Sequence, residues 1–381
     1  MRWPSVRRLS IHSDIFMVDS ALPPMVEEVG ICGIRAEDLP RLAFPASLRN
    51  LSLSCLEPTH FVGDELRGAK QITHLSLDGE FTSVDVSGFT YLTSLALRFS
   101  VLDVAYLNMG GIRQLRHLKL EKVHLDLAER FSELETLHLV GVLPLPKLPR
   151  TLKRLTIEYM HLSALDISTL TDLLEVNIID CRLETLNLVQ FPPNVKTISL
   201  RHNRLKSLMV KSRPYPFPAS VTHLDLRSNA LETLPGEGVV LPPDLEWLDA
   251  TDTLLNVPHV WSDDFPLAFR EYRKLRYLAV SFNHSPNGIG CPLEIRAAAR
   301  FPPSLSTLRI AAPQLDEFTL DASSHLRTLT ITGPNYIGPF VGKNDLRRGK
   351  HLRHLHLLSP SLFNILSLRL PKDLTLLTFE S

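Results

Sequence analysis

Cysteine is scarce in this sequence: four residues are spread over 381 positions, and none belongs to a Cys-x-x-Cys pair. A disulfide framework or a cysteine-rich zinc site needs more cysteines at closer spacing, so neither organises the chain. Secreted repeat proteins usually carry paired cysteines near their ends, and no such pairs occur here. We therefore expect an intracellular, cytoplasmic location, with the nucleus as an alternative.

Long apolar runs and net charge are also missing. No stretch of eighteen apolar residues occurs, and the first thirty residues lack the pattern of a signal peptide, so we expect no membrane association. Lys plus Arg equals Asp plus Glu at 41 each. Because no net field attracts polyanions, a nucleic acid is not an expected partner, and any electrostatic preference must be local.

The common catalytic motifs are absent as well: there is no Gly-rich phosphate loop, no His-Glu-x-x-His pair and no Gly-x-Ser-x-Gly elbow. We predict that the chain is not an enzyme and takes no cofactor, metal or small-molecule substrate. Fifteen histidines are present, and His74, His117, His223 and His354 recur at one motif position. Adjacent strands could bring such residues to a metal, but most of these copies are not adjacent, so a solvated surface is expected.

One pattern fills the sequence: apolar-x-x-apolar-x-apolar occurs seventeen times at intervals of 18 to 30 residues. The copies begin at residues 6, 26, 48, 72, 92, 115, 134, 152, 173, 195, 221, 245, 275, 305, 326, 352 and 374. Self-similarity at such a period indicates a solenoid of stacked repeats. We predict one solenoid over residues 1–381, with about seventeen repeats.

Each copy predicts a short strand with one apolar face. Within Leu115-x-x-Leu118-x-Leu120, residues 118 and 120 share a face and residue 119 points the opposite way. No single repeat can bury that apolar face, whereas stacked repeats line up their leucines into a continuous core. The residues between the leucines then form one exposed face of a parallel sheet.

Several copies continue with a small polar residue and a further leucine, as in Asn203 with Leu205 and Asn229 with Leu231. A buried amide there can bond the backbone of the turn that leaves the strand. We therefore assign a structural ladder to Cys181, Asn203, Asn229 and Thr253.

The extended pattern, nearly complete in residues 195–205 (VKTISLRHNRL) and 221–231 (VTHLDLRSNAL), resembles the leucine-rich-repeat family over about residues 6–379. The resemblance implies an α/β repeat solenoid, a horseshoe with a curved parallel sheet on its concave face and mostly extended or short-helical convex segments. Eight copies follow a Leu/Phe-Pro-x-x-Leu/Val signature, which is similar to FNIP-type repeats, bacterial effector ubiquitin ligases and some fungal intracellular repeat proteins. Proline fixes φ, so we expect an extended approach to those strands.

The repeat period is interrupted in four places, where repeat proteins often carry partner-specific surface. The insertions lie near residues 207–220, 256–274, 284–304 and 333–349. Within the third of them, residues 292–300 predict a short helix.

Aromatic and arginine side chains, which are enriched at binding hot spots, gather between residues 201 and 282. We predict a partner-binding surface on the concave face, made of Arg201, His202, Asp225, Arg227, Trp247, Asp249, Arg276, Tyr277 and Phe282. The alternative is that Trp247 and Tyr277 merely cover neighbouring leucines.

These features predict a non-enzymatic protein-interaction scaffold with a protein partner. By analogy with the resembling families, it is the substrate-recognition part of a ubiquitin-ligase adaptor or a similar intracellular regulator. One alternative is the recognition domain of a larger catalytic effector, such as a ubiquitin ligase, whose enzyme domain lies outside this chain. Another is an extracellular receptor ectodomain.

Overall fold

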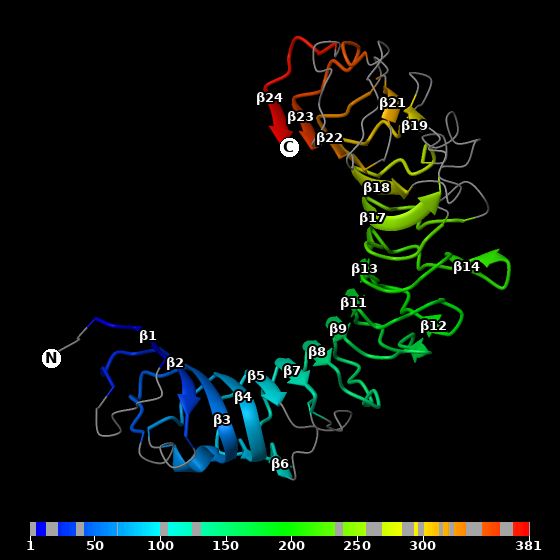
Figure 1. Cartoon of the computed structure of the whole chain (residues 1–381). Coiled ribbons are helices and arrows are strands. Elements are labelled where there is room, and N and C mark those ends of the chain that lie inside the picture. The colour runs from blue at the N-terminus through cyan, green and yellow to red at the C-terminus, as the bar shows by residue number, and fades with distance from the viewer. Residues whose placement is uncertain are drawn as a thin grey trace. The chain divides into compact units, whose positions relative to one another are not determined.

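The structure is a computed structural model of the whole chain (Figure 1). It describes residues 5–12, 22–35, 42–66, 68–99, 106–123, 131–232, 239–256, 269–283, 293–295, 301–311, 315–318, 320, 324–332, 345–358 and 369–380.

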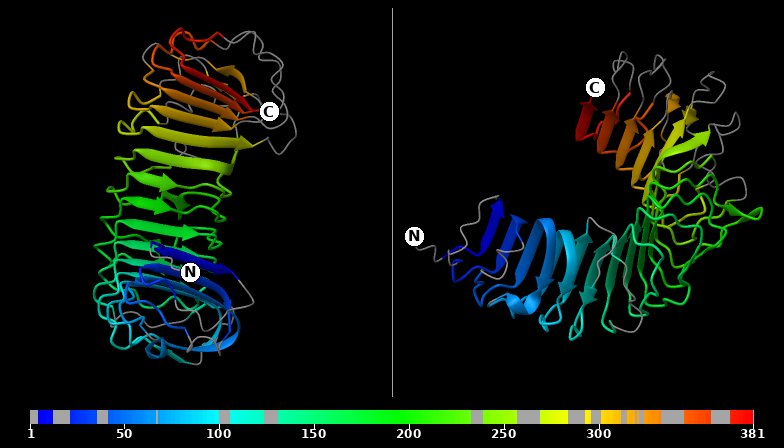
Figure 2. Two further views of the ribbon diagram at one scale, coloured as in Figure 1. Left: turned by 90° about the vertical axis from the view of Figure 1, so that its left-hand side faces the viewer. Right: turned by 60° about the horizontal axis from the view of Figure 1, so that its bottom comes forward.

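The chain divides into two compact units, residues 1–160 and 161–381. Within each unit, parallel strands lie side by side, as Figure 2 shows. A strand begins two residues into every one of the seventeen copies of the sequence pattern, from Arg8 in the first copy to Leu376 in the last. The repeat pattern therefore locates the strands directly.

The first unit stacks its main strands in chain order, each parallel to the next. They are β1 (Arg8–His12), β2 (Glu28–Ile34), β3 (Asn50–Val62), β4 (His74–Asp85), β5 (Ser94–Phe99), β7 (His117–Glu121), β8 (Thr136–Val140) and β9 (Arg154–Glu158). A further strand, β6 (Tyr106–Asn108), pairs with the end of β4, and a single 3₁₀ turn, η2, spans Gly63–Glu65.

The second unit follows the same plan, again with consecutive parallel pairs. Its main strands are β11 (Glu175–Ile179), β13 (Thr197–Ser199), β16 (His223–Asp225), β17 (Trp247–Asn256), β18 (Tyr277–Asn283), β20 (Thr307–Ala311), β22 (Thr328–Thr332), β23 (His354–Leu358) and β24 (Leu376–Glu380). Short parallel pairs join the segments between strands: β10 (Leu165–Asp166) with β12 (Val189–Gln190), and β19 (Leu293–Ile295) with β21 (Leu315–Phe318).

The core of each unit lies on the apolar face of its strands. Leu118 and Leu120 are 2% and 0% exposed, and Lys119 between them is half-buried. Leu120 pairs in register with Leu97 on one side and Leu139 on the other, both fully buried. Each such leucine contributes roughly 1.5–3 kcal/mol to stability, which makes stacking the main stabilising interaction.

The segments between strands are mostly extended or turns, and η2 is the only helical element in the described ranges. No helix in the described part of the chain has the length and the apolar composition needed to cross a bilayer.

The proline signature forms a tight turn where an extended approach was expected. The carbonyl of Pro45 accepts a hydrogen bond from the Leu48 amide at 3.0 Å, and Pro302 and Leu305 repeat the same contact. Proline suits this place because the first residue of the turn contributes its carbonyl and its missing amide is not needed. Ser47 then donates from its hydroxyl to the carbonyl of Val26, 2.7 Å away in the preceding repeat. The signature therefore ties one repeat to the one before it.

Two of the insertions carry structure that the sequence did not predict. Residues 207–220 contain an antiparallel hairpin, β14 (Met209–Val210) with β15 (Arg213–Pro214), whose two turn residues have positive φ, as tight hairpins require. Of the predicted helix over residues 292–300, residues 293–295 are instead strand β19, because pairing with β21 overrides local helix preference. Residues 292 and 296–300 lie outside the described ranges, as do most of the insertions near 256–274, 284–304 and 333–349.

Candidate functional site

Three aromatic rings form a row across β16, β17 and β18 of the second unit. Strand register places His223 beside Trp247, and Trp247 beside Tyr277, at the first outward position of each strand. The Trp247 and Tyr277 rings are stacked with centroids 5.1 Å apart and planes 11° apart. His223 stacks on the other side of Trp247 at 6.4 Å and 22°. The row is a rigid, partly exposed platform.

A charged network lies at the next outward position of the same strands. Asp225 and Asp249, which are paired in register, are only 8% and 4% exposed. Asp225 accepts hydrogen bonds from Arg227 Nε at 2.9 Å and Nη2 at 2.7 Å, and from the Ser199 hydroxyl at 3.2 Å. Asp249 accepts from the backbone and hydroxyl of Thr251, at 3.0 and 2.7 Å.

Two buried carboxylates thus share one guanidinium, because Arg227 Nε also lies 3.9 Å from Asp249. The hydrogen bond to Asp225 raises the pKa of Arg227 above its ordinary value, so Arg227 stays charged. Burial raises the pKa of Tyr277, although its hydrogen bond with Arg309 opposes the change. The network fixes charged side chains beside the rings.

The structure brings together five of the nine predicted surface residues: Asp225, Arg227, Trp247, Asp249 and Tyr277. Arg276 is exposed at the start of β18. Arg201 is half-buried after β13, and its Nε is buried without an acceptor among the described residues. His202 is exposed in the following turn at φ 56°, and its amide donates to the carbonyl of Arg227.

Phe282 departs from the prediction that placed it on the exposed face. It is 4% exposed, and strand alternation puts it on the same side as Leu278 and Val280, which are fully buried. Strand β18 is longer than most strands here and continues the alternation past Val280, the last apolar position of the sequence pattern. Phe282 therefore belongs to the core.

The four ladder residues lie at the turns that leave the strands. Asn203 accepts from the amides of Cys181 and Leu183 at 3.0 and 3.1 Å, and donates to the carbonyls of Ile178 and Leu200 at 2.7 and 2.9 Å. Asn229 repeats this arrangement one strand further on. The Thr253 hydroxyl donates to the carbonyl of Ala250 at 2.9 Å, and the Cys181 thiol to that of Ile179 at 3.3 Å. Their hydrogen bonds fix the turns that follow the strands, including the turn that contains Arg201 and His202.

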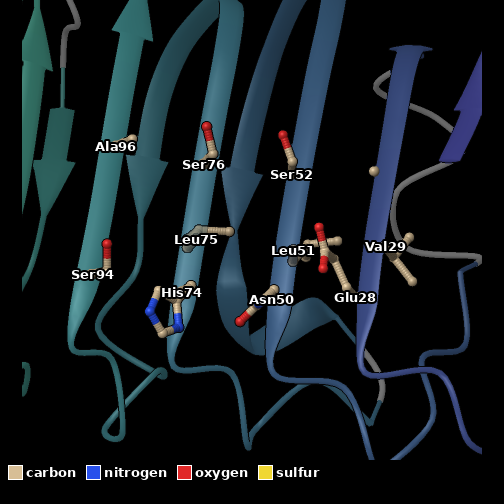
Figure 3. A pocket seen from close by; sticks show the side chains of 11 residues that line it. Glu28, Val29, Asn50, Leu51, Ser52, His74, Leu75, Ser76, Ser94 and Ala96 are labelled. Carbon is tan, nitrogen blue, oxygen red and sulfur yellow. The ribbon is translucent and has the colours of Figure 1, made fainter. Parts of the chain in front are cut away.

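A hollow of about 230 Å³ on the exposed face of the first unit was not predicted from the sequence (Figure 3). It crosses β2 to β5, and its floor is the small-residue row Gly30, Ser52, Ser76 and Ala96. Glu28, Asn50, His74 and Ser94 line one side. The signal was present in the sequence, since the residue between the last two apolar residues of the pattern is small in the first five copies, from Ser10 to Ala96.

The histidines of the repeated motif position do not meet. In the first unit, Ser94 of β5 separates His74 of β4 from His117 of β7. Among the residues that the structure describes, no three His, Cys, Asp or Glu side chains are grouped closely enough to hold a metal ion.

No protein-family model matches the chain, and no curated protein matches it in sequence. Solved structures do match. A circular leucine-rich-repeat protein, CroV588, has 16% identity and a TM-score of 0.52, with 94% of this chain and 57% of that one covered. TLR13, in a complex with the RNA ssRNA13, has 16% identity and a TM-score of 0.51, with coverages of 93% and 54%. The leucine-rich effector YopM from Yersinia pestis has 17% identity and a TM-score of 0.48, with coverages of 95% and 85%.

This chain spans little more than half the length of the CroV588 and TLR13 chains that it matches. At these identities the likeness concerns the fold. The predicted fold class, a leucine-rich-repeat solenoid with a parallel sheet and mostly extended returns, is confirmed.

Proposed function

We propose that this protein is a protein-binding scaffold, whose partner docks on the exposed sheet face of β13 to β20 in the second unit. The observation that carries the proposal is the stacked Trp247–Tyr277 pair at 5.1 Å, set beside the buried Asp225–Arg227–Asp249 network. Rigid aromatic rings next to fixed charges lose little conformational entropy on binding, and such residues dominate the free energy of protein interfaces.

The alternative role of these rings is to cover the leucines beneath them. Trp247 and Tyr277 are only half-buried, whereas Leu248 and Leu278 are already fully buried on the opposite face of the sheet. Covering the core therefore does not account for two large stacked rings at neighbouring outward positions.

In the cell, the scaffold is proposed to act as the substrate-recognition part of a ubiquitin-ligase adaptor or a similar intracellular regulator. The Pro-x-x-Leu turns, which resemble those of FNIP-type, bacterial-effector and fungal intracellular repeat proteins, support this class. The thiols Cys32 and Cys55 are free, in keeping with a reducing compartment. The second candidate, the recognition domain of a larger catalytic effector, places the same docking face beside an enzyme domain encoded elsewhere in a longer chain.

The proposal is tested by affinity capture from cell lysate with the whole chain and with a Trp247→Ala/Tyr277→Ala variant. Each protein retained by the wild type is then purified and its dissociation constant measured against both. Loss of both rings is expected to weaken the binding of a true partner by roughly 2 kcal/mol or more, about thirtyfold in the dissociation constant, because stacked aromatic residues are typical hot spots.

Tyr91→Ala/Tyr159→Ala is the matched control, since both tyrosines are exposed, at 53% and 63%, on the first unit. A partner that binds the double-ring variant and the wild type equally contradicts the docking face. Retention of ubiquitin-ligase subunits supports the adaptor role, and their absence from every purified complex contradicts that role.

A further inference from the structure

Three arginines of the second unit, Arg276, Arg327 and Arg353, occupy the same repeat position, one residue before strands β18, β22 and β23. The Ser306 amide donates to the carbonyl of Arg276 at 2.9 Å, the Arg327 amide to Ser306 at 2.8 Å, and the Arg353 amide to Arg327 at 2.9 Å. These bonds place the four residues at equivalent positions of β18, β20, β22 and β23. Arg327 and Arg353 are therefore neighbours on adjacent strands, and Arg276 lies two strands from Arg327.

Further cationic or protonatable side chains lie on the same strands or directly before them. Arg309 of β20 is exposed at an outward position. His325 and His351, one residue before the first leucine of their repeats, stack their rings at 5.1 Å and 8°. His354 and His356 occupy the two outward positions of β23.

Acidic residues are missing from the described segments that carry these strands. The described segments 274–283, 304–311, 325–332 and 351–358, which contain β18, β20, β22 and β23, hold five Lys or Arg residues, four His, and no Asp or Glu. Lys274 has a partner in the preceding repeat, Asp244 at 2.8 Å. We call Arg276, Arg309, Arg327 and Arg353 the basic face.

The basic face is not neutralised from elsewhere in the described ranges. None of its four arginines has a carboxylate within 4.0 Å there, and Arg353 donates to the backbone carbonyls of Lys350 and Leu352. In the first unit, by contrast, cross-strand pairs such as Arg7–Glu27 and Lys153–Glu135 neutralise the same repeat position. Like charges on adjacent strands destabilise a sheet, so Arg327 beside Arg353 is unfavourable unless an anion binds there.

We propose that the basic face binds an acidic, carboxylate-rich segment of the protein partner. The inference rests on the proposed function and deepens it by naming the chemistry of the partner. Arginine forks match carboxylates well. Across four strands the face is about 14 Å long, which suits an extended peptide of about four or five residues.

A nucleic acid fits this surface less well. Carboxylates flank the basic face on both sides: Glu246 and Asp249 lie at β17, and Asp373 and Glu380 lie at β24. A longer polyanion would meet these charges. The Trp247 and Tyr277 rings also stack on each other at 5.1 Å, which leaves no space between them for a base.

The test is fluorescence anisotropy with the full chain and three labelled probes of equal length: an oligoglutamate, an oligoglutamine and a single-stranded RNA. The oligoglutamate is expected to bind best, and more weakly at higher ionic strength. Reversing three charges, in Arg276→Glu/Arg327→Glu/Arg353→Glu, is expected to lower its affinity by roughly tenfold or more, because each exposed pair contributes up to about 1 kcal/mol.

Arg113→Glu/Lys147→Glu/Arg150→Glu is the matched control, because these exposed residues of the first unit change the net charge equally. It is expected to keep its affinity within about twofold. The corresponding Arg→Gln triple variant, which adds no negative charge, replaces the reversal variant if that fails to fold, and is expected to show a smaller loss in the same direction.

The proposal is overturned if the oligoglutamate does not bind, if the control loses as much affinity as the reversal variant, or if the RNA binds as tightly as the oligoglutamate. These outcomes are distinct from a failure of the docking face. If partner binding is weakened by Trp247→Ala/Tyr277→Ala but unaffected by the arginine substitutions, the proposed function stands. Only the proposal of an acidic segment is then contradicted.

Discussion

Asn203 and Asn229 donate to the same acceptor: the side-chain amide of each lies 2.9 Å from the carbonyl oxygen of Leu200. The two amides are 7% and 5% exposed. Adjacent repeats are therefore joined by polar side chains as well as by the leucine core, at the edge that carries Arg201 and His202.

Replacing Asn203 with Ala should lower the free energy of unfolding by about 3 kcal/mol, because several backbone groups would lose their partner in a buried place. Urea unfolding followed by circular dichroism measures the change. Asn194→Ala is the control: its amide makes one exposed bond, to Thr171 at 3.1 Å, so a loss below about 0.5 kcal/mol is expected. Equal effects of the two substitutions would contradict the ladder.

The structural ladder and the strands could be predicted from the sequence because both follow from its periodicity. A strand needs only alternation, and the position of Asn203 is fixed by its distance from Leu200 in the same repeat. Phe282 was missed because β18 continues beyond the usual strand length, and the length of a strand depends on its pairing with neighbouring strands. The strand over residues 293–295 depends on pairing with β21 (Leu315–Phe318), which local preference does not reveal.

The candidate site was predicted in part for the same reason. Period two identified Trp247 and Tyr277 as outward residues, and the strand register then stacks them. The sequence could not reveal that Arg227 turns back onto Asp225, because a pair two residues apart in a regular strand is not obliged to meet. The basic face was also overlooked, since its consecutive arginines are separated by 18 to 33 residues in sequence and become neighbours only through stacking.

Arg227→Met should destabilise the protein by about 2–3 kcal/mol, since it leaves Asp225 and Asp249 buried without their counter-charge. The Arg347–Asp345 pair has the same geometry, with bonds of 2.9 and 2.7 Å, but more exposed side chains. Arg347→Met is therefore expected to cost less than about 1 kcal/mol. Urea midpoints of the two variants test the difference, and the reverse order would mean that the buried network is not what stabilises this region.

Cys32 should react with a thiol reagent long before Cys55. Cys32 is exposed, whereas Cys55 is 2% exposed and its pKa is raised by burial to about 11, so little thiolate is present near neutral pH. Timed alkylation with iodoacetamide, followed by peptide mapping, measures each site. In denaturant, Cys55 is expected to react at the rate of Cys32. Rapid labelling of Cys55 in the native protein would show that β3 opens in solution.

Gly79 and Gly30 should respond oppositely to replacement by Ala, although both lie in strands of the first unit. Gly79 has φ +120°, and a Cβ there would lie 2.0 Å from the carbonyl oxygen of Cys55, so backbone would have to move. Gly79→Ala should cost about 2 kcal/mol or more. At Gly30 the nearest atom to a Cβ would be the Ser10 hydroxyl at 3.9 Å, so Gly30→Ala should change stability by less than about 0.5 kcal/mol while narrowing the hollow. Thermal unfolding of the two variants decides the matter: a tolerated Gly79→Ala would mean that the β3–β4 pairing does not hold this residue in its left-handed conformation.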